Sequence, residues 1–334
     1  MTMTRQQFAK LMVEGLRQVF VEQYKEKELV YPQVFDVTRS RKQFEVDYSV
    51  ASIGMLSSKQ EGVAMSYEDF VPGYSVTYTH TSYAKGIRIT RELMDDELYG
   101  VISKRSKALA RSARYRKEYD HARVFYYAAT TAASGGVFTG GDGKALLDTA
   151  HPLIGVAGAT YGNTPSSATT LSATALNTAL LSLRKVPDDQ NMLISLRPAV
   201  LLVPPDLEVT AWEILNSQQK PYTSDNDRNF WDQRLKLVVW DQIGAQGSTT
   251  AWFVLCDKSE CAPISFDRVP VEFDNDGDFD TKDLKISAYT RYSCGFSDWR
   301  WVYGYSAAVH SWEWGGRDNR RHDGSTLTNV IQYV

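Results

Sequence analysis

The longest helical pattern in the chain is TRELMDDELYGVISKRSKALARSARYRKEYDHARVFYYAA, residues 90–129. No proline interrupts it, Thr90 is a competent N-cap, and four acidic side chains follow where the positive end of the helix dipole favours them. Eight Lys and Arg residues lie beyond Gly100, toward the carbonyl end. At about 1.5 Å per residue an unbroken helix of this length would reach roughly 60 Å, more than one compact core needs. The stretch predicts a spine helix on which the other parts of the chain are arranged.

The apolar face of this spine is narrow and broken. Its apolar positions are Leu98, Ile102, Leu109, Tyr119 and Tyr126. Polar residues interrupt that stripe at Arg105, Ser112, Arg116 and Arg123. The basic residues could face nucleic acid, but no aromatic interleaving of the kind found in single-strand binders accompanies them. Helix-end complementarity and intersubunit ion pairs are therefore the favoured interpretation.

The composition is that of a folded protein with two or three structural regions. The 334 residues are 43% hydrophobic and carry a formal net charge of -3, so no global basic excess indicates nucleic-acid binding. Cys256, Cys261 and Cys294 lack CxxC spacing, which favours structural thiols in a reducing compartment. No stretch has the continuous apolar character of a signal peptide or a transmembrane helix. We expect folding in the cytoplasm and no membrane partner.

Residues 5–29 are typical of an amphipathic helix that ends before Tyr31 and Pro32. Its apolar stripe could dock on the chain's own body or on a neighbouring copy, and the sequence favours neither. From Gln43 to Thr90 the apolar period changes to two, which predicts strands at 44–50 and 74–79 joined by a polar tip at 57–62. So extended a hairpin, with few residues to bury, needs other chains to lie on.

A Gly, Ala, Ser and Thr-rich loop, residues 130–170, follows the spine. The pattern then predicts a helix capped by Ser172, a buried strand at 199–203, a helix from Pro205 to about Asn216, and strands at 235–240 and 252–256. This order predicts an α/β unit covering residues 140–265.

The last third returns to an apolar period of two. Residues 284–292 and 299–305 alternate aromatic or aliphatic with polar side chains. We expect these two segments to pair as an antiparallel aromatic layer over the spine.

Local motifs do not make a recognisable active site. The run 135–144 fails as a phosphate loop, because Phe138 replaces its first Gly and Ala145 its Ser or Thr. The five histidines lack metal-site spacing. His151, close to Asp148, could be imagined as a general base, but a turn histidine that satisfies a backbone group is favoured. We therefore assign no catalytic residue, cofactor site or metal site from the sequence.

The acidic segment 272–283 approximates a calcium-binding EF-hand loop. The positions in register are Glu272, Asp274, Asp276, Gly277, Phe279 and Asp283. Both ends fail, since the first position is Glu instead of Asp and the last is Asp instead of a bidentate Glu. Strand patterns also flank the segment where helices are needed. An acidic, solvent-facing hairpin turn is favoured over a bound cation.

The order of these parts resembles the capsid fold shared by tailed bacteriophages and herpesviruses. Locally, the run Gly141–Leu153, GDGKALLDTAHPL, resembles a segment of Mu-like major head subunits, as do Leu201–Glu208, LLVPPDLE, and the downstream strand Leu235–Trp240, LKLVVW. The resemblance covers residues 5–309, and residues 310–334 fit it poorly. It implies an α+β fold with an N-terminal arm, an extended β-hairpin (the E-loop), a spine helix with an antiparallel sheet (the P-domain) and an α/β A-domain.

The resemblance implies boundaries for these parts. They are the arm at 1–41, the hairpin at 42–89, the spine and first part of the P-domain at 90–139, the A-domain at 140–265, the P-domain sheet return at 266–309, and a C-terminal segment at 310–334. It also implies a structural subunit without catalytic activity, assembled in the host cytoplasm into pentamers and hexamers. These form an icosahedral phage head around double-stranded DNA, which the protein contacts non-specifically.

The same resemblance implies scaffold, portal and possible decoration proteins as further partners. Some relatives crosslink a hairpin Lys to a neighbour's Asn, and Lys59 is the positional candidate, although a solvated lysine is favoured. An encapsulin-like shell around a cargo enzyme is the first alternative. An enzyme with a site near His151 is the second.

Overall fold

The computed structural model describes residues 5–67, 69, 72–95, 99–130, 138–156, 158–219, 228–245, 249–278, 281 and 283–306. Within these ranges the side chains of residues 5–13, 94, 95, 99 and 101 are outside the description. The expected C-terminal segment, 310–334, lies outside it altogether.

Helices make up the spine and cover the α/β unit. They are α1 Arg5–Lys25, α2 Tyr31–Val34, α3 Arg91–Asp95, α4 Tyr99–Tyr126, α5 Ala173–Lys185, η2 Pro205–Leu207, α6 Glu208–Asn216 and α7 Asp241–Ala245. The strands are β1 Asp36–Arg39, β2 Phe44–Val50, β3 Pro72–Thr79, β4 Thr81–Ile89, β5 His151–Pro152, β6 Thr160–Tyr161, β7 Pro198–Val203, β8 Lys236–Val239, β9 Trp252–Cys256, β10 Ile264–Gly277, β11 Leu284–Gly295 and β12 Val302–Tyr305. No helix in the described part is long and apolar enough to cross a bilayer.

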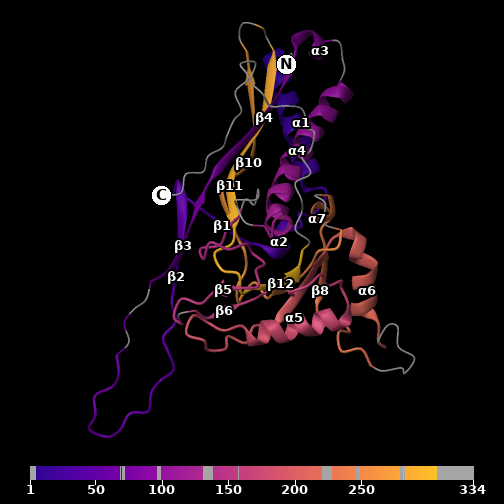
Figure 1. Cartoon of the computed structure of the whole chain (residues 1–334). Coiled ribbons are helices and arrows are strands. Elements are labelled where there is room, and N and C mark those ends of the chain that lie inside the picture. Colours follow the sequence, from indigo (N-terminus) through magenta and orange to yellow (C-terminus); the bar gives the residue numbers. More distant parts are fainter. Residues whose placement is uncertain are drawn as a thin grey trace, which may run out of the picture.

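Three regions are distinct in Figure 1: an upper layer of α1 and α4 beside long strands, an α/β unit at the base, and the β2–β3 hairpin reaching away at the left. In the upper layer the sheet order is β1-β10-β11-β4. One face of that sheet packs on α4 and α1 through a cluster that includes Ile102, Leu109, Ile286 and Ala288. The predicted spine is thus observed as the 28-residue helix α4, preceded by the short helix α3.

The N-terminal helix docks on the chain's own body. Leu16 and Phe20 are buried in the same cluster as Leu109 of α4. The buried Ser106 hydroxyl of α4 donates to the Leu16 carbonyl at 3.1 Å. The helix ends at Lys25, four residues earlier than expected, and Tyr31 and Pro32 begin α2 instead of only stopping the helix.

The expected pairing of segment 284–292 with segment 299–305 is wrong. β11 pairs with β10 on one side and with β4 on the other, whereas β12 pairs with β9 in the α/β unit. A period of two identifies a strand but leaves its partner open, because alternation along one strand says nothing about which sheet that strand joins. Residues 81–89, which the resemblance assigned to the hairpin, form the sheet strand β4. The short polar strand β1, which pairs in parallel with β10, had no alternation to reveal it.

The α/β unit has the predicted order of helix, strand, helix, strand and strand. Its sheet is ordered β12-β9-β7-β8. After β10 and β11 in the upper layer, the chain therefore returns to the α/β unit through β12. The Ser172 hydroxyl accepts from the Ala175 N–H at 3.1 Å and caps α5 as expected. Leu176 and Leu183 of α5 are buried in the unit's core with Leu201 and Val203 of β7.

Candidate functional site

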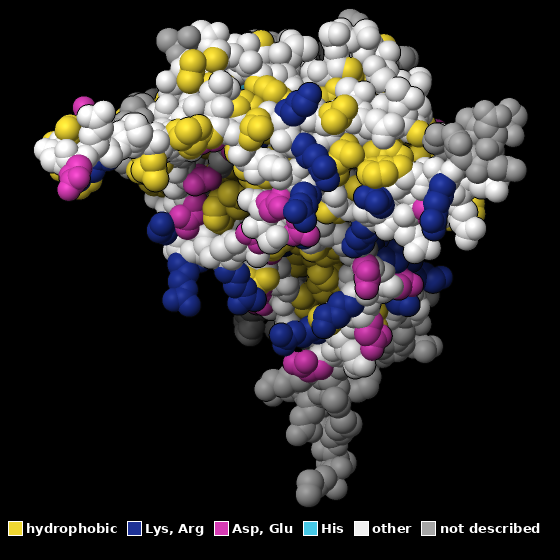
Figure 2. Space-filling model, turned by 90° about the horizontal axis from the view of Figure 1, so that it is seen from below, with side chains coloured by type: hydrophobic (Ala, Val, Ile, Leu, Met, Phe, Trp, Pro, Cys, Tyr) yellow, Lys and Arg dark blue, Asp and Glu magenta, His cyan; other side chains and the backbone are white. Residues whose placement is uncertain are grey.

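The β2–β3 hairpin exposes apolar side chains to solvent. They are Phe44, Tyr48, Val50, Ile53, Met55, Leu56, Val63, Met65 and Tyr67, called here the hairpin surface. Leu56 is 93% exposed and Met55 is 84% exposed, which is far beyond what a folded chain leaves open by chance at neighbouring positions. Figure 2 shows the hairpin projecting at the left with hydrophobic side chains on it. The hairpin was expected to have few residues to bury. None of these nine apolar side chains is buried within the described chain.

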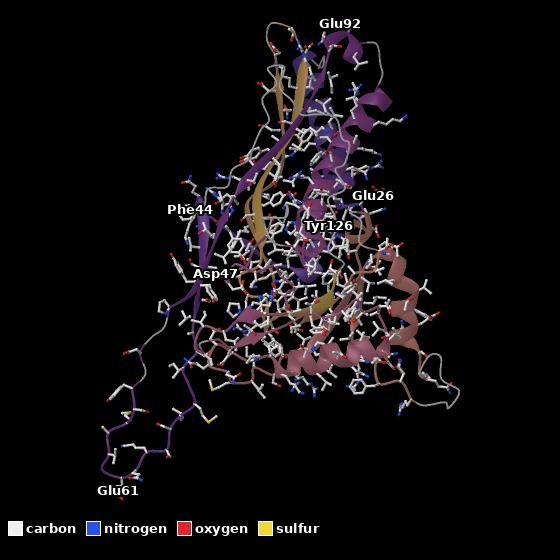
Figure 3. All side chains as sticks on the ribbon, viewed as in Figure 1. Glu26, Phe44, Asp47, Glu61, Glu92 and Tyr126 are labelled. Atoms are coloured by element: carbon white, nitrogen blue, oxygen red, sulfur yellow. The ribbon has the colours of Figure 1, made fainter. Side chains whose placement is uncertain are left out.

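The tip of the hairpin lies far from the remainder of the molecule. Glu61 marks the tip and Phe44 the base in Figure 3. Gly62 has a φ of 80°, and the Val63 N–H donates to the Gln60 carbonyl at 3.3 Å, so the chain reverses at the end of the predicted tip. Lys59 is exposed beside this turn. The tip therefore has nothing in the described chain to rest on.

The base of the hairpin, in contrast, is anchored. The Tyr78 hydroxyl lies 2.6 Å from the Ser297 hydroxyl, and its ring packs edge-on against Phe266 at 5.2 Å. Burial raises the pKa of Tyr78 well above its usual range. A Cβ at Gly141 would lie 2.6 Å from Tyr74 Cβ, so this glycine lets the loop approach β3. The glycine-rich run, described from residue 138 onward, thus seats the hairpin instead of a phosphate.

A polar cluster lies in the C-terminal part of α4. It consists of the buried Lys117, Glu118, Asp120 and His121 and the half-buried Arg116, called here the spine hub. Its members contact β4, β10, β11 and the segment before α2, so the hub joins the spine to most of the upper layer.

Lys117 makes the ion pair of the hub. Its side chain is 3% exposed, and its Nζ donates to Asp267 of β10 at 2.8 and 3.1 Å. The ammonium also lies 5.3 Å from the centre of the Tyr292 ring and 5.8 Å from that of Tyr31. Since a buried lysine without a carboxylate would have to lose its charge, this pair is an obligatory part of the fold.

Asp120 joins two aromatic strands to the spine. Arg116 Nε donates to Asp120 at 2.9 Å, and the Tyr292 hydroxyl of β11 donates to the same carboxylate at 2.7 Å. The Arg116 guanidinium also lies 4.4 Å from the centre of the Tyr83 ring of β4. Burial and the neighbouring Asp120 charge raise the pKa of Tyr292, so the phenol stays protonated and remains a donor.

His121 is held neutral. Its Nδ1–H donates to the Lys117 carbonyl at 2.7 Å, and Nε2 accepts from the Ser265 hydroxyl at 2.8 Å. The ring stacks on Tyr31 at 4.1 Å. Burial, with a smaller contribution from the Lys117 charge, lowers the pKa of His121 to about 3.

Glu118 links the spine to the segment that precedes α2. Its Oε1 accepts from the Val30 N–H at 2.6 Å, just before α2. Burial raises the pKa of Glu118. Among described atoms its Oε2 and the buried Trp240 Nε1 of the α/β unit both lack a hydrogen-bond partner, although the two groups are near enough for the indole to lower that pKa.

The spine hub was not predicted from the sequence, because these charges were assigned to the helix end and to intersubunit ion pairs. A signal was present: five of the six residues from 116 to 121 can be charged. Six consecutive residues span more than one and a half helical turns, so their side chains cannot share one solvent face. Some had to point at the sheet and find partners there.

His151 lies in a buried pair and not in an open site. Its Nδ1 donates to Asp142 Oδ2 at 2.6 Å, and its ring stacks on Trp299 at 4.3 Å. The predicted backbone partner is wrong, and Asp148 contacts the Ala150 N–H and Lys144 instead. In the described structure Nε2 has no partner, hence no hydroxyl or thiol positioned for activation.

The acidic segment is part of a hairpin. Residues 272–277 belong to β10, and the Asp278 N–H donates to the Asp283 carbonyl at 2.9 Å across the turn. The Asp283 carboxylate pairs with Arg88. Phe279 lies outside the described residues, and the described part holds no group of three or more His, Cys, Asp or Glu arranged for a metal. The pairing of β10 with β11 confirms the predicted hairpin, whereas the preference against a bound cation stays a prediction.

A cavity of about 310 Å³ lies between α4 and the sheet edge. Its lining includes Tyr83, Lys85, Leu109 and Tyr289. It contains Arg116, which is already engaged with Asp120, but no described acid–base pair. The cavity is therefore a packing gap beside the spine hub.

Comparison with known proteins gives a consistent answer. The model of the phage capsid protein family matches residues 73–304, and no curated protein matches the chain. A capsid structure of the cyanophage P-SCSP1u is 12% identical, with 84% of this chain and 89% of that one covered and a TM-score of 0.56. The capsid of a native GTA particle, computed with C5 symmetry, is 13% identical over 84% and 90%, with a TM-score of 0.53.

The bacteriophage JBD30 capsid is 12% identical over 65% of this chain and 91% of that chain, with a TM-score of 0.51. At such identities these likenesses show the fold, which confirms the phage capsid architecture expected from the sequence. The family match establishes the family and its structural role, because it covers the chain from the hairpin's second strand to β12. The chain belongs to the phage capsid protein family and is a structural, major capsid protein of the virion.

Proposed function

We propose that the chain forms pentamers and hexamers that close into the icosahedral head of a tailed bacteriophage around double-stranded DNA. The observation that carries this proposal is the hairpin surface, whose apolar side chains find no cover in their own described chain. Exposed apolar surface of this extent is stable in water when another copy covers it, and identical copies close most simply under symmetry.

In this proposal the parts of the chain have separate tasks. The hairpin crosses onto a neighbour, the layer of α4 and its sheet forms the capsomer periphery, and the α/β unit lies toward the capsomer axis. Residues 1–41 can act as an arm on a neighbouring subunit only if α1 detaches from the spine of its own chain. In the structure Leu16 and Phe20 are packed on that spine. A boundary at residue 80 or 81 suits the hairpin better than one at 89, because β4 pairs with β11.

The proposed subunit has no catalytic task. The buried His151 and Asp142 pair supports this, because a stacked ring with no described nucleophile beside it stabilises a loop and cannot reach a substrate from solvent. Scaffold, portal and decoration proteins are proposed as partners during assembly in the host cytoplasm. Lys59, exposed at the tip, is proposed to be solvated and not crosslinked.

Negative-stain electron microscopy with size-exclusion chromatography of the purified full-length protein tests the proposal. Closed shells, or rings of five or six subunits, are the expected result. Particles that enclose DNA when purified from infected or packaging cells support a phage head, whereas a protein cargo indicates an encapsulin-like shell. A monomer at every concentration, also when the chain is co-expressed with a scaffold protein, contradicts the proposal.

A further inference from the structure

A row of cations lies on the exposed face of α4. Lys104, Lys107 and Arg111 are spaced by three and four residues, so they form one line along the helix, with Arg105 beside it. We call these four residues the spine stripe. Nitrogen-tipped side chains project from the side of α4 that faces away from the sheet in Figure 3. All four are exposed, unlike Arg116 and Lys117 farther along the helix.

The spine stripe is unneutralised. Within the part of the chain that the structure describes, none of its members has a carboxylate within ion-pair distance. Two cations on the sheet face that points away from α4 are neutralised by ion pairs, unlike the stripe. Arg88 pairs with Asp283, and Lys285 pairs with Asp278. Four adjacent positive charges repel one another, so an anion bound to them from outside lowers the free energy of this face.

The helix dipole does not account for the stripe. A dipole stabilises cations only in the last turn of a helix, and the one basic residue in the last turn of α4 is Arg123. Residues 104–111 lie in the first half of α4. Helix-end complementarity, one of the two explanations favoured from the sequence, therefore fails for these four residues, whereas intersubunit ion pairs stay a prediction.

The sheet face opposite the helices carries exposed carboxylates. Val271 and Phe273 of β10 pack on the α1 and α4 cluster, so the alternating residues Glu272 and Asp274 point to the other face of the sheet. Both of these acids are exposed. Because the cations Arg88 and Lys285 of that face are paired with acids, its exposed charge differs in sign from that of the spine stripe.

We propose that the spine stripe is the surface on which the phosphate backbone of packaged double-stranded DNA rests. This inference relies on the proposed function and names the residues of its DNA contact. The stripe is poor in apolar side chains, with only the small, exposed Ala108 next to Lys107, and lysine is depleted from the cores of protein interfaces. Phosphates need only flexible point charges and carry no sequence information, which fits Lys and Arg on an open helix face.

The test measures binding of a mixed-sequence DNA duplex to the unassembled full-length protein by fluorescence anisotropy between about 50 and 200 mM salt. One variant combines Lys104→Gln, Lys107→Gln and Arg111→Gln. A matched control removes the same charge from the α/β unit with Arg184→Gln, Lys185→Gln and Lys236→Gln, all exposed. We expect the stripe variant to lower the slope of log affinity against log salt by about 2 to 3, because each phosphate contact contributes about 0.9.

The control variant should keep most of the slope, and a stripe variant made with Lys104→Arg and Lys107→Arg should keep nearly all of it. Equal slopes in wild type and stripe variant, or equal losses in stripe and control variants, would overturn the proposal. The proposal would also be overturned if the stripe variant lost binding to polyglutamate but bound DNA as the wild type does. That result would indicate an acidic protein partner. Electron microscopy of the same proteins distinguishes failure of this inference from failure of the proposed function. If shells form but DNA binding does not depend on the stripe, only this inference is rejected.

Discussion

The spine hub and the hairpin surface are opposite in composition and in environment. In the spine hub, Lys117, Asp120 and His121 are buried and matched to partners in the same chain. In the hairpin surface, Leu56 and Met55 face water, and no part of the chain that the structure describes covers them. The difference teaches which contacts this sequence completes alone and which it leaves for another copy: the fold of the subunit depends on the first, and assembly on the second.

The largest expected effect comes from breaking the spine hub at Lys117. Lys117→Met leaves the Asp267 carboxylate, which is mostly buried, without its partner. Removing one member of a buried ion pair typically costs about 3 to 5 kcal/mol. Urea denaturation of the unassembled protein measures this loss. Arg105→Met, on the exposed face of the same helix, is the matched control and should change the free energy of unfolding by less than about 0.5 kcal/mol.

An equal effect of the two methionine substitutions would show that Lys117 is not specially buried. The double variant Lys117→Met with Asp267→Asn sharpens the result, because it removes the uncompensated charge. It should recover part of the loss, as neutral replacement of both partners in a buried pair usually does.

The second effect depends on pH and isolates His121. Because its pKa is about 3 in the folded protein, against about 6.5 in an unfolded chain, the unfolded chain binds the proton first as the pH falls. The contribution is fully present above pH 6.5 and is lost progressively as the pH falls toward 3. Between pH 7 and pH 5 we expect the wild type to lose about 2 kcal/mol more than His121→Gln, which does not titrate.

Glu118 titrates in the opposite sense, since burial raises its pKa, but it is present in both proteins and cancels in the comparison. Denaturation midpoints at matched pH values give the result. Parallel stability profiles for wild type and His121→Gln would mean that His121 is as accessible to protons in the fold as in the unfolded chain.

A smaller effect is expected where the two regions meet. Tyr78→Phe removes only the hydroxyl that lies 2.6 Å from Ser297, and the ring stays packed on Phe266. Loss of one such hydrogen bond costs about 1 kcal/mol. Thermal unfolding measures it, with Tyr48→Phe on the exposed part of the hairpin as control. A loss as large as that of Lys117→Met would place the hairpin base inside the cooperative core.

The smallest effect on folding, and the sharpest contrast, is expected at the hairpin surface. Met55→Ser with Leu56→Ser should change the free energy of unfolding of the free subunit by no more than about 0.5 kcal/mol. Assembly should nevertheless weaken, because these side chains have no other cover. Light scattering against protein concentration measures this, with Lys59→Ser and Gln60→Ser as the polar control. Unchanged assembly with both pairs would separate the hairpin surface from the interface.

Much of the architecture was predictable from local patterns. Period-two alternation located β2, β3 and β11, and the Ser172 cap located the start of α5, because these signals depend on neighbouring residues alone. Strand partners were less predictable. The aromatic segment 302–305 could have joined either sheet, and only the β9 edge, set by the tertiary fold, decided it.

The hairpin surface was partly predictable from the sequence, and the spine hub was not. A hairpin needing outside contacts was predictable from its length, but the exposure of Met55 and Leu56 depends on where the tip projects. The spine hub was hidden because hydrophobic periodicity counts Lys117 and His121 as outward-facing, whereas their partners Asp267 and Ser265 lie more than a hundred residues away. The Mu-like character of the segment 141–153 stays a prediction, and so do the exact domain boundaries.

The central claim is that the hairpin surface is completed by another copy of the chain. Cryo-electron microscopy of assembled particles tests it directly, through the density around residues 51–67. The account predicts that Met55, Leu56 and Tyr67 are buried against a neighbouring subunit while the spine hub keeps its contacts within one chain. A closed shell in which these three side chains still face solvent would contradict it.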